Sequence, residues 1–213
     1  MQKRGLFIVL EGLDRSGKSS QCKNILNFFA QKEMAAELIN FPNRETQTGK
    51  MIDGYLKNSD TKLGDEVVHL LYSTNRWEMK EYILETINSG THIVCDRYAY
   101  SGVAYTHAKG LDFDWCVAPD KGLPHPDLVL FVNTTAEEIS KRAGFGDERY
   151  EKTEFQEKVY SAFIKMKDVE PHWHDIEGGS ATIEEIESRI TEKISETLES
   201  YSSGEDLPTN LFQ

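Results

Sequence analysis

The stretch LFIVLEGLDRSGKS, residues 6–19, decides the fold. Its first five residues are apolar, which is typical of a buried strand. Residues 12–19 then give a full GxxxxGK[ST] pattern, and the residues that follow carry apolar side chains at helical spacing, at Ile25, Phe28 and Phe29. A strand, a glycine-rich turn and a helix in this order predict a phosphate-binding P-loop rather than a plain turn.

The residue types of this pattern have a physical purpose. Glycines let backbone amides point at phosphate oxygens, and the start of the helix adds a partial positive charge. Lys18 is expected to bridge the outer phosphates of ATP, and Ser19 is expected to reach Mg²⁺. The predicted ATP-binding residues in this stretch are Gly12, Leu13, Asp14, Arg15, Ser16, Gly17, Lys18, Ser19 and Ser20.

The rest of the chain alternates short apolar runs with longer amphipathic segments. Further runs occupy 36–41, 92–96, 128–132 and, more weakly, 172–176. Helical spacing is found over 18–33, 65–89, 98–109, 135–142, 151–169 and 182–200. This alternation predicts a three-layer α/β fold in which helices flank a five-stranded parallel sheet.

The length of 213 residues suits one domain over 1–213. Within it we expect a lid at about 142–150 and a polar tail at about 202–213. The first half of that tail is expected to have little fixed structure, whereas Leu211 and Phe212 have the apolar side chains needed to dock on the core.

Composition narrows the functional classes. The net charge of −12 argues against a nucleic-acid-binding surface, which needs a basic face. No apolar run reaches the roughly 18 residues of a membrane span, and the run at 6–10 is too short for a signal-peptide core. Three cysteines without a CxxC pair suit a reducing compartment. We therefore expect a cytoplasmic protein, with a nuclear presence also compatible.

Polar residues follow two of the apolar runs, where the carboxyl ends of parallel strands form a ligand crevice. Asp96 is placed to hold Mg²⁺ through water, and Arg97 to clamp an acceptor phosphate, although the two neighbours would also make a plain ion pair. Phe41 and Arg44 follow the second run, where a surface loop is an equally good interpretation.

Two further features fit an acceptor site. Tyr72 and Arg76 are four residues apart and share a helix face, so they could hold an aromatic base, or they could be a core ring and a salt-bridge partner. Gly144 and Gly146 would serve as hinges of a closing lid, or belong to an ordinary loop between helices. We find no NKxD-type segment, which disfavours a GTPase switch.

In order and spacing, the chain resembles the eukaryotic and poxviral thymidylate kinases over residues 5 to about 160. The stretches that carry the resemblance are EGLDRSGKSSQ, NFPNRETQTGKMI, VHLLYSTNRWE, CDRYAYSGVAYTHAKG, GLPHPDLVLF and RAGFGDERYE. The resemblance implies transfer of the γ-phosphate of ATP to dTMP, giving dTDP and ADP for dTTP synthesis, with Mg²⁺ as cofactor. It also implies a homodimer formed through helices that flank the sheet.

The resemblance assigns roles to matching positions. Asp14 would contact the region of the sugar 3′-hydroxyl, and Arg15 would reach the γ-phosphate. Catalysis would involve Arg15, Lys18, Asp96 and Arg97. For the acceptor, Arg44 and Arg97 would grip the 5′-phosphate, Tyr72 would stack on thymine, Arg76 would donate to its O4, and Tyr105 would crowd the sugar 2′ position; Phe41, Ser101 and Gly102 would complete the pocket.

In the lid, the resemblance places Arg142 near adenine and lets Glu148, Arg149 and Tyr150 close over the substrates. Tyr72 and Tyr105 carry hydroxyls where relatives often have Phe. Two rivals stay open, a kinase for another monophosphate such as dUMP or UMP, and a regulatory module that holds ATP without using it.

Overall fold

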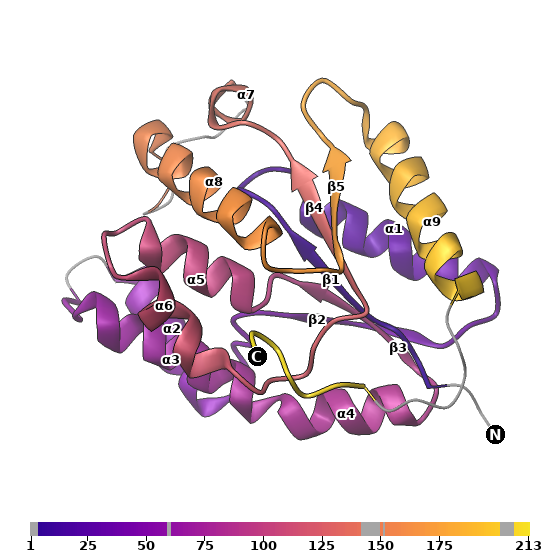
Figure 1. The fold of residues 1–213 in the computed structure, drawn as a ribbon, viewed down its shortest axis with the longest axis horizontal. Helices are drawn as coiled ribbons and strands as arrows, with labels where there is room; N and C mark the ends of the chain where they lie inside the picture. The colour runs from indigo at the N-terminus through magenta and orange to yellow at the C-terminus, as the bar shows by residue number, and fades with distance from the viewer. Residues whose placement is uncertain (1–3, 59–60, 142–149, 151, 201–206) are drawn as a thin grey trace.

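The computed structural model describes residues 4–58, 61–141, 150, 152–200 and 207–213. Among them, five strands form one parallel sheet in the order β2-β3-β1-β4-β5 (Figure 1). The strands are β1 (Phe7–Glu11), β2 (Ala36–Asn40), β3 (His92–Asp96), β4 (Leu128–Asn133) and β5 (Trp173–Glu177). Each predicted apolar run contains one strand, so the predicted α/β fold is confirmed.

The central strand β1 is buried on both faces, because its side chains alternate between two apolar clusters. Phe7 and Val9 face the cluster beneath α4 (Lys80–Asn88), α5 (Ala99–His107) and α8 (Thr153–Lys167). Ile8 and Leu10 face the cluster beneath α1 (Lys18–Gln31) and α9 (Ile183–Ser200). Helices therefore cover both sides of the sheet, as Figure 1 shows.

The segment 65–89, where helical spacing was found, is helical but divided into two helices. The segment forms α3 (Asp65–Glu78) and α4, which meet at Met79. The two helices bury different kinds of side chain. α3 buries polar groups such as Asn75, whereas α4 buries Ile83 and Ile87 in the apolar cluster against the sheet. The turn at Met79 separates the helix with these polar contacts from the helix that packs on the sheet.

Several short helices were not predicted. α2 (Gln47–Lys57) contains two glycines, and its start is fixed by Thr46, whose side chain accepts a hydrogen bond from the Gly49 amide at 3.1 Å. α6 (Phe113–Val117) begins at Asp112 in the same way, and a 3₁₀ turn, η1 (Ala118–Asp120), follows it. α7 (Ala136–Ser140) falls within the predicted segment 135–142.

The end of the chain docks as expected. Leu211 is fully buried, and the Phe212 ring lies edge-on to Tyr100 with their centroids 5.5 Å apart. The Leu211 amide donates to the Leu123 carbonyl at 3.2 Å. The expectation for the first half of the tail concerns residues that lie mainly outside the described ranges. None of the described helices is long and apolar enough to cross a membrane.

Candidate active site

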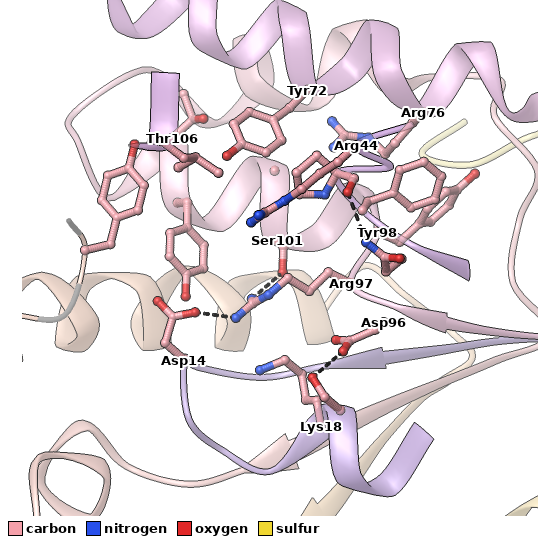
Figure 2. A pocket seen from close by; sticks show the side chains of 18 of the residues that line it. Asp14, Lys18, Arg44, Tyr72, Arg76, Asp96, Arg97, Tyr98, Ser101 and Thr106 are labelled. Atoms are coloured by element: carbon pink, nitrogen blue, oxygen red, sulfur yellow. Dashed lines mark hydrogen bonds and ion pairs between the residues drawn. The ribbon is translucent and has the colours of Figure 1, made fainter. Parts of the chain in front are cut away.

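A cavity of about 600 Å³ opens at the carboxyl ends of β1, β2 and β3, close to the P-loop (Figure 2). This volume is in the usual range for a small-molecule site. Many of the predicted site residues line it, namely Asp14, Arg15, Gly17, Lys18, Ser19, Ser20, Phe41, Arg44, Tyr72, Arg76, Asp96, Arg97, Ser101, Gly102, Tyr105 and Tyr150. Five lid residues, Arg142, Gly144, Gly146, Glu148 and Arg149, lie outside the described residues.

The remaining predicted P-loop residues shape the turn. Gly12 has a φ of 147°, and a Cβ there would lie 2.9 Å from both the Val132 carbonyl oxygen and the Ser16 hydroxyl oxygen. Only glycine fits such a backbone without strain. Leu13 is fully buried and anchors the turn in the core, and Ser16 is 1% exposed.

Lys18 at the start of α1 is 5% exposed, and its ammonium points into the cavity (Figure 2). Its Nζ donates to the Leu13 carbonyl at 2.6 Å and to the Ser16 hydroxyl at 3.2 Å. Burial and, next, the nearby Arg97 charge lower the pKa of Lys18 to about 8, against the opposing effect of Asp14. An anionic ligand at this ammonium would compensate for the buried charge.

Ser19 and Asp96 meet at the floor of the cavity. The register of β1 with β3 pairs Leu10 with Asp96, which puts the end of β3 beside the P-loop. There the Ser19 hydroxyl donates to Asp96 Oδ2 at 2.6 Å. A hydroxyl and a carboxylate side by side are the oxygen donors that suit Mg²⁺, so these two residues fit the predicted metal site.

Arg97 follows β3 with a φ of 68° and turns back over the P-loop. Its guanidinium pairs with Asp14, and its Nη1 donates to the Gly12 carbonyl at 3.2 Å and to the Ser101 hydroxyl at 3.0 Å. Arg97 therefore pairs with Asp14 and not with its neighbour Asp96, which was the alternative. Burial raises the pKa of Asp14, but Arg97 and Lys18 outweigh it, so the pKa lies below its usual value.

Sequence reasoning missed Glu11, the last residue of β1. Its carboxylate is fully buried and accepts hydrogen bonds from the Tyr98 amide at 2.8 Å, the Ser101 amide at 3.1 Å and the Ser101 hydroxyl at 2.5 Å. Burial raises the pKa of Glu11, partly offset by Arg97. Glu11 thereby holds the first turn of α5 against the P-loop. The signal in the sequence that could have identified Glu11 is a single acidic residue directly after an apolar run.

Gln156 of α8 was missed as well. Its side-chain amide is buried and donates to Asp14 Oδ2 at 3.1 Å and to the Tyr150 carbonyl at 2.9 Å. The Tyr150 ring packs edge-on against Tyr105, with the centroids 5.9 Å apart. Gln156 therefore connects the P-loop acid to the described end of the predicted lid.

The far wall of the cavity is built on α3. Arg76 is 1% exposed and forms a two-pronged pair with Asp120, with Nε–Oδ1 at 3.0 Å and Nη2–Oδ2 at 2.6 Å. The salt-bridge alternative is thus present, and Arg76 also lines the cavity. Its Nη1 takes no part in the pair and lies beside Gly102, where a Cβ would come within 3.0 Å of it.

Aromatic side chains fill the space around these charges. Tyr72 is half-buried on α3, and burial raises the pKa of its hydroxyl to about 12, so it stays protonated. Tyr105 lies under the Arg97 guanidinium, 5.4 Å from Cζ to the ring centroid. Phe41 is buried against Tyr98, and Arg44 reaches the cavity from a half-exposed position, where it pairs with Asp53 at 2.9 Å.

A P-loop on a parallel sheet, with a second set of basic and aromatic groups in the same cavity, defines a P-loop kinase acting on a small phosphorylated acceptor. The family model for thymidylate kinases matches residues 10–190 of the chain. The chain belongs to the thymidylate kinase family.

Individual relatives agree with this assignment. The thymidylate kinase of Schizosaccharomyces pombe is 47% identical over 198 residues, which cover 91% of this chain and 93% of the relative. The thymidylate kinase of Homo sapiens is 45% identical over 191 residues, or 88% of this chain and 89% of the relative. The solved structure of thymidylate kinase from Candida albicans superposes with a TM-score of 0.87 at 40% identity, covering 99% of this chain and 100% of that one.

Proposed function

We propose that this protein transfers the γ-phosphate of ATP to dTMP, giving dTDP and ADP. One observation carries the proposal beyond the family: a single cavity joins the P-loop cation Lys18 to the acceptor-side cation Arg97, through the carboxylate of Asp14 between them. A donor phosphate and an acceptor phosphate can therefore be held next to each other, which is the main requirement of phosphoryl transfer.

The chain's own residues supply charge and orientation. Lys18 and Arg15 act on the donor phosphates, and Arg97, fixed by Glu11 through Ser101, orients the acceptor. Mg²⁺ held by Ser19 and Asp96 would neutralise charge on the β- and γ-phosphates. The acceptor phosphate is already an anion near neutral pH, so the transfer is in line and needs no dedicated general base.

Two residues of α3, Arg76 and Tyr72, select the base. The guanidinium of Arg76 donates hydrogen bonds only, so it matches the O4 acceptor of thymine or uracil and opposes the amino group of cytosine. Asp120 holds this guanidinium in one orientation, and the Tyr72 ring supplies a surface for the base. The proposal gives Tyr105, which is partly buried beneath Arg97, the role of excluding a ribose 2′-hydroxyl.

The same proposal includes a lid that closes through Arg142, Glu148 and Arg149. The adenine of bound ATP would then lie near Arg142. The hydrogen bonds from Gln156 to both Asp14 and Tyr150 support it, because a movement near Tyr150 would change the contact that Gln156 makes with Asp14 of the P-loop. Closure would exclude water from the transferred phosphate.

The homodimer is likewise a proposal. Along α3, Val67 is 49% exposed, Leu70 is 45% exposed and Trp77 is 37% exposed. Their spacing of three and seven residues puts them on one face of the helix, away from the cavity-lining Tyr72 and Arg76. An apolar stripe of this kind suits a two-fold contact between identical chains.

We also propose that the enzyme works in the cytoplasm, with a nuclear fraction. Cys22, Cys95 and Cys116 are free and buried, as expected for a chain that does not depend on disulfides. Fluorescence microscopy of the tagged full chain would test this, and an exclusively secreted or organellar signal would contradict it.

The function is tested by measuring ADP formation with Mg²⁺, ATP and each nucleoside monophosphate in turn. We expect fast ADP formation with dTMP, little with UMP or CMP, and none without an acceptor. Equal rates with all acceptors would contradict the base selection by Arg76. Tight ATP binding without ADP formation would favour a regulatory nucleotide-binding module instead.

A further inference from the structure

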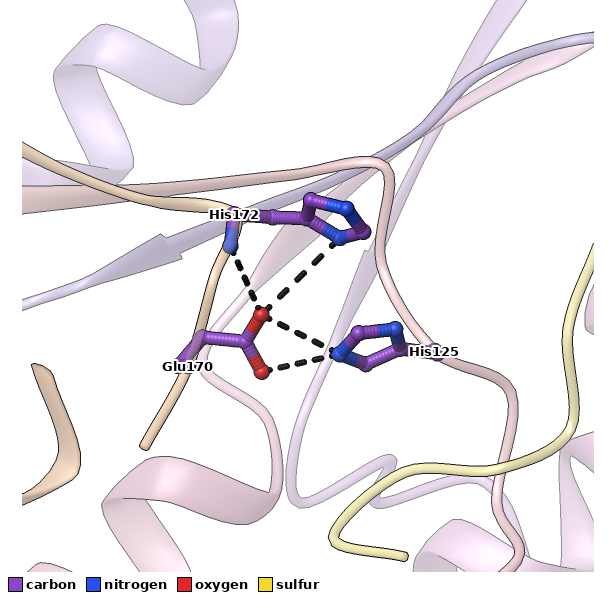
Figure 3. A group of neighbouring side chains, drawn as sticks. All are labelled: His125, Glu170 and His172. Carbon is purple, nitrogen blue, oxygen red and sulfur yellow. Dashed lines mark hydrogen bonds and ion pairs between the residues drawn. The ribbon is translucent and has the colours of Figure 1, made fainter. Parts of the chain in front are cut away.

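We infer that His125, Glu170 and His172 form a second metal site, which takes a divalent transition-metal cation of the Zn²⁺ class (Figure 3). One ligand atom from each residue can be chosen so that all three lie within 4.8 Å of one another. Two imidazole nitrogens and one carboxylate oxygen are a donor set that Zn²⁺ binds, with a fourth position left for water.

The site lies at the amino ends of the strands, whereas the P-loop lies at their carboxyl ends. His125 precedes β4, and Glu170 and His172 precede β5, at the amino ends of two parallel neighbours. The register Val129↔Trp173 holds these segments together, and the Val129 amide donates to the His172 carbonyl at 2.9 Å. The phosphate cavity opens at the carboxyl ends and contains none of the three residues.

The distances leave room for an ion after small movements. His125 Nε2 is 3.1 Å from Glu170 Oε1, and His172 Nδ1 is 3.9 Å from the same oxygen. Zn–N and Zn–O bonds of about 2.0–2.2 Å in a tetrahedron put ligand atoms about 3.3–3.5 Å apart. The two observed distances lie on either side of that spacing.

Protons now occupy the positions that a cation would take. His125 Nε2–H donates to Glu170, and His172 Nδ1–H donates to the Pro126 carbonyl at 2.9 Å. When a cation binds these two nitrogens, the single ring proton of each neutral imidazole moves to its other nitrogen, which is Nδ1 in His125 and Nε2 in His172. The His172 side chain is 45% exposed, so that proton can be solvated and the cation has a path of entry.

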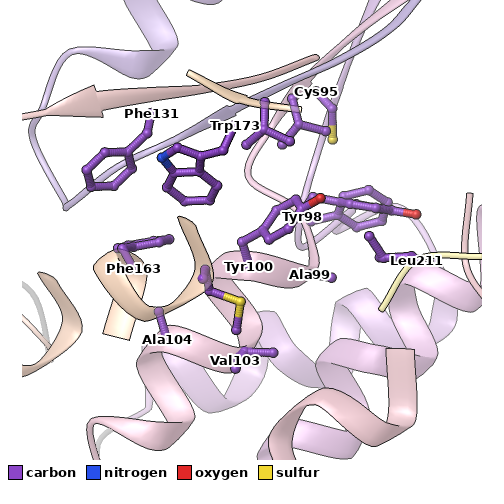
Figure 4. Close-up of a cluster of buried hydrophobic side chains, with 14 of the residues drawn as sticks. Cys95, Tyr98, Ala99, Tyr100, Val103, Ala104, Phe131, Phe163, Trp173 and Leu211 are labelled. Atoms are coloured by element: carbon purple, nitrogen blue, oxygen red, sulfur yellow. The ribbon is translucent and has the colours of Figure 1, made fainter. Parts of the chain in front are cut away.

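The carboxylate is already oriented by surrounding donors, as metal ligands usually are. The Tyr100 hydroxyl donates to Glu170 Oε2 at 2.6 Å, and the His172 amide donates to Oε1 at 3.0 Å. Tyr100 itself lies in the apolar cluster of Figure 4, among Phe163, Trp173 and Leu211. The Glu170 side chain is 2% exposed, so it cannot swing out to solvent without unpacking this cluster.

A cation at this site would have a structural role. The His125 amide donates to the Pro208 carbonyl at 2.7 Å, so one cation would connect the segments before β4 and β5 and, through His125, the end of the chain. A ligand that binds only the folded state raises the melting temperature. Zn²⁺ should therefore stabilise the fold without taking part in phosphoryl transfer.

The test is calorimetric titration of the chelator-treated full chain with Zn²⁺, without nucleotide and with Mg²⁺ in excess to occupy oxygen sites such as Asp96. We expect one Zn²⁺ per chain, and at least tenfold weaker binding after either His125→Ala or His172→Ala. His174→Ala is the matched control, since His174 lies on β5 near Lys193 and Glu196 of α9, outside the cluster.

Melting curves and turnover complete the test. Zn²⁺ should raise the melting temperature of the unaltered chain and of His174→Ala but not that of His172→Ala, and dTMP turnover with Mg²⁺ should be the same in all three. His172 is half-exposed, so its replacement leaves the core intact. Absence of Zn²⁺ binding to the unaltered chain, or undiminished binding by both cluster variants, would overturn the inference.

Discussion

At the scale of single residues, Lys18 is the group on which the account depends most. Lys18→Ala should lower kcat by at least about 10²–10³-fold, the usual effect of removing one charge-stabilising donor. Lys23→Ala, on the exposed side of the same helix, is the control and should keep full activity. Steady-state rates and melting curves check this, and a folded Lys18→Ala enzyme with normal turnover would refute the P-loop assignment.

The charge of Lys18 also predicts a pH dependence. Its lowered pKa of about 8 means that the ammonium is present below that pH and is lost above it. Since kcat/KM reports the free enzyme, kcat/KM for ATP should fall as the pH rises through about 8. A profile at dTMP concentrations well below its KM, where the enzyme is mostly free, measures this limb. A value that stays constant from pH 7 to beyond 9 would show that Lys18 keeps its proton.

Residues also show where sequence reasoning stopped. The glycines and Lys18 of the P-loop were predictable because motif and context lie within fourteen adjacent positions. Glu11 and Gln156 were not, because their partners are brought close only by tertiary packing. For Arg76, the sequence left a base donor and a salt bridge as alternatives, and the structure contains the salt bridge at the cavity wall.

At the scale of elements, the pair Arg76–Asp120 fastens α3 to the 3₁₀ turn η1. Both side chains are buried, so removing one leaves the other as an uncompensated charge. Arg76→Leu or Asp120→Leu should each lower the free energy of unfolding by ~3–5 kcal/mol, and the double variant should lose less than the sum. Denaturant unfolding measures the cycle, and simple additivity would exclude a direct interaction.

Most of the longer elements were predictable from their apolar side chains. Four of the strands and the long helices α1, α8 and α9 have clear apolar patterns, β5 has a weaker one, and all are present near their expected bounds. The break at Met79 has no such pattern, and α2, although amphipathic, spans only eleven residues and contains two glycines. They are set by polar contacts such as Asn75 with the Asn43 backbone, at 2.7 and 3.1 Å, which a single sequence does not reveal.

At the scale of the whole molecule, the apolar stripe of α3 predicts self-association. Leu70→Glu puts a charge in the proposed contact and should convert a dimer to a monomer. Ile183→Glu changes an apolar residue on α9 that is 56% exposed, somewhat more than Leu70, and is the control. Light scattering after gel filtration gives the mass. A dimer that survives Leu70→Glu would place the contact elsewhere, and a monomeric unaltered chain would contradict the proposal.

The parallel sheet separates two kinds of site. The cavity for the reactive phosphates lies at the carboxyl ends of the strands. The cluster of His125, Glu170 and His172, which we infer to be a structural metal site, lies at their amino ends. A kinase whose donor and acceptor share one cavity should pass the phosphate directly between them. Neither water nor a protein side chain should receive it on the way.

The most direct measurement follows the phosphate itself. The protein is mixed with Mg²⁺, dTMP and ATP labelled at the γ-phosphate, and the labelled products are separated over a single turnover. The account predicts that the label appears in the β-phosphate of dTDP at the rate at which ADP forms. Label in inorganic phosphate, or first on the protein, would contradict direct transfer between the two sites.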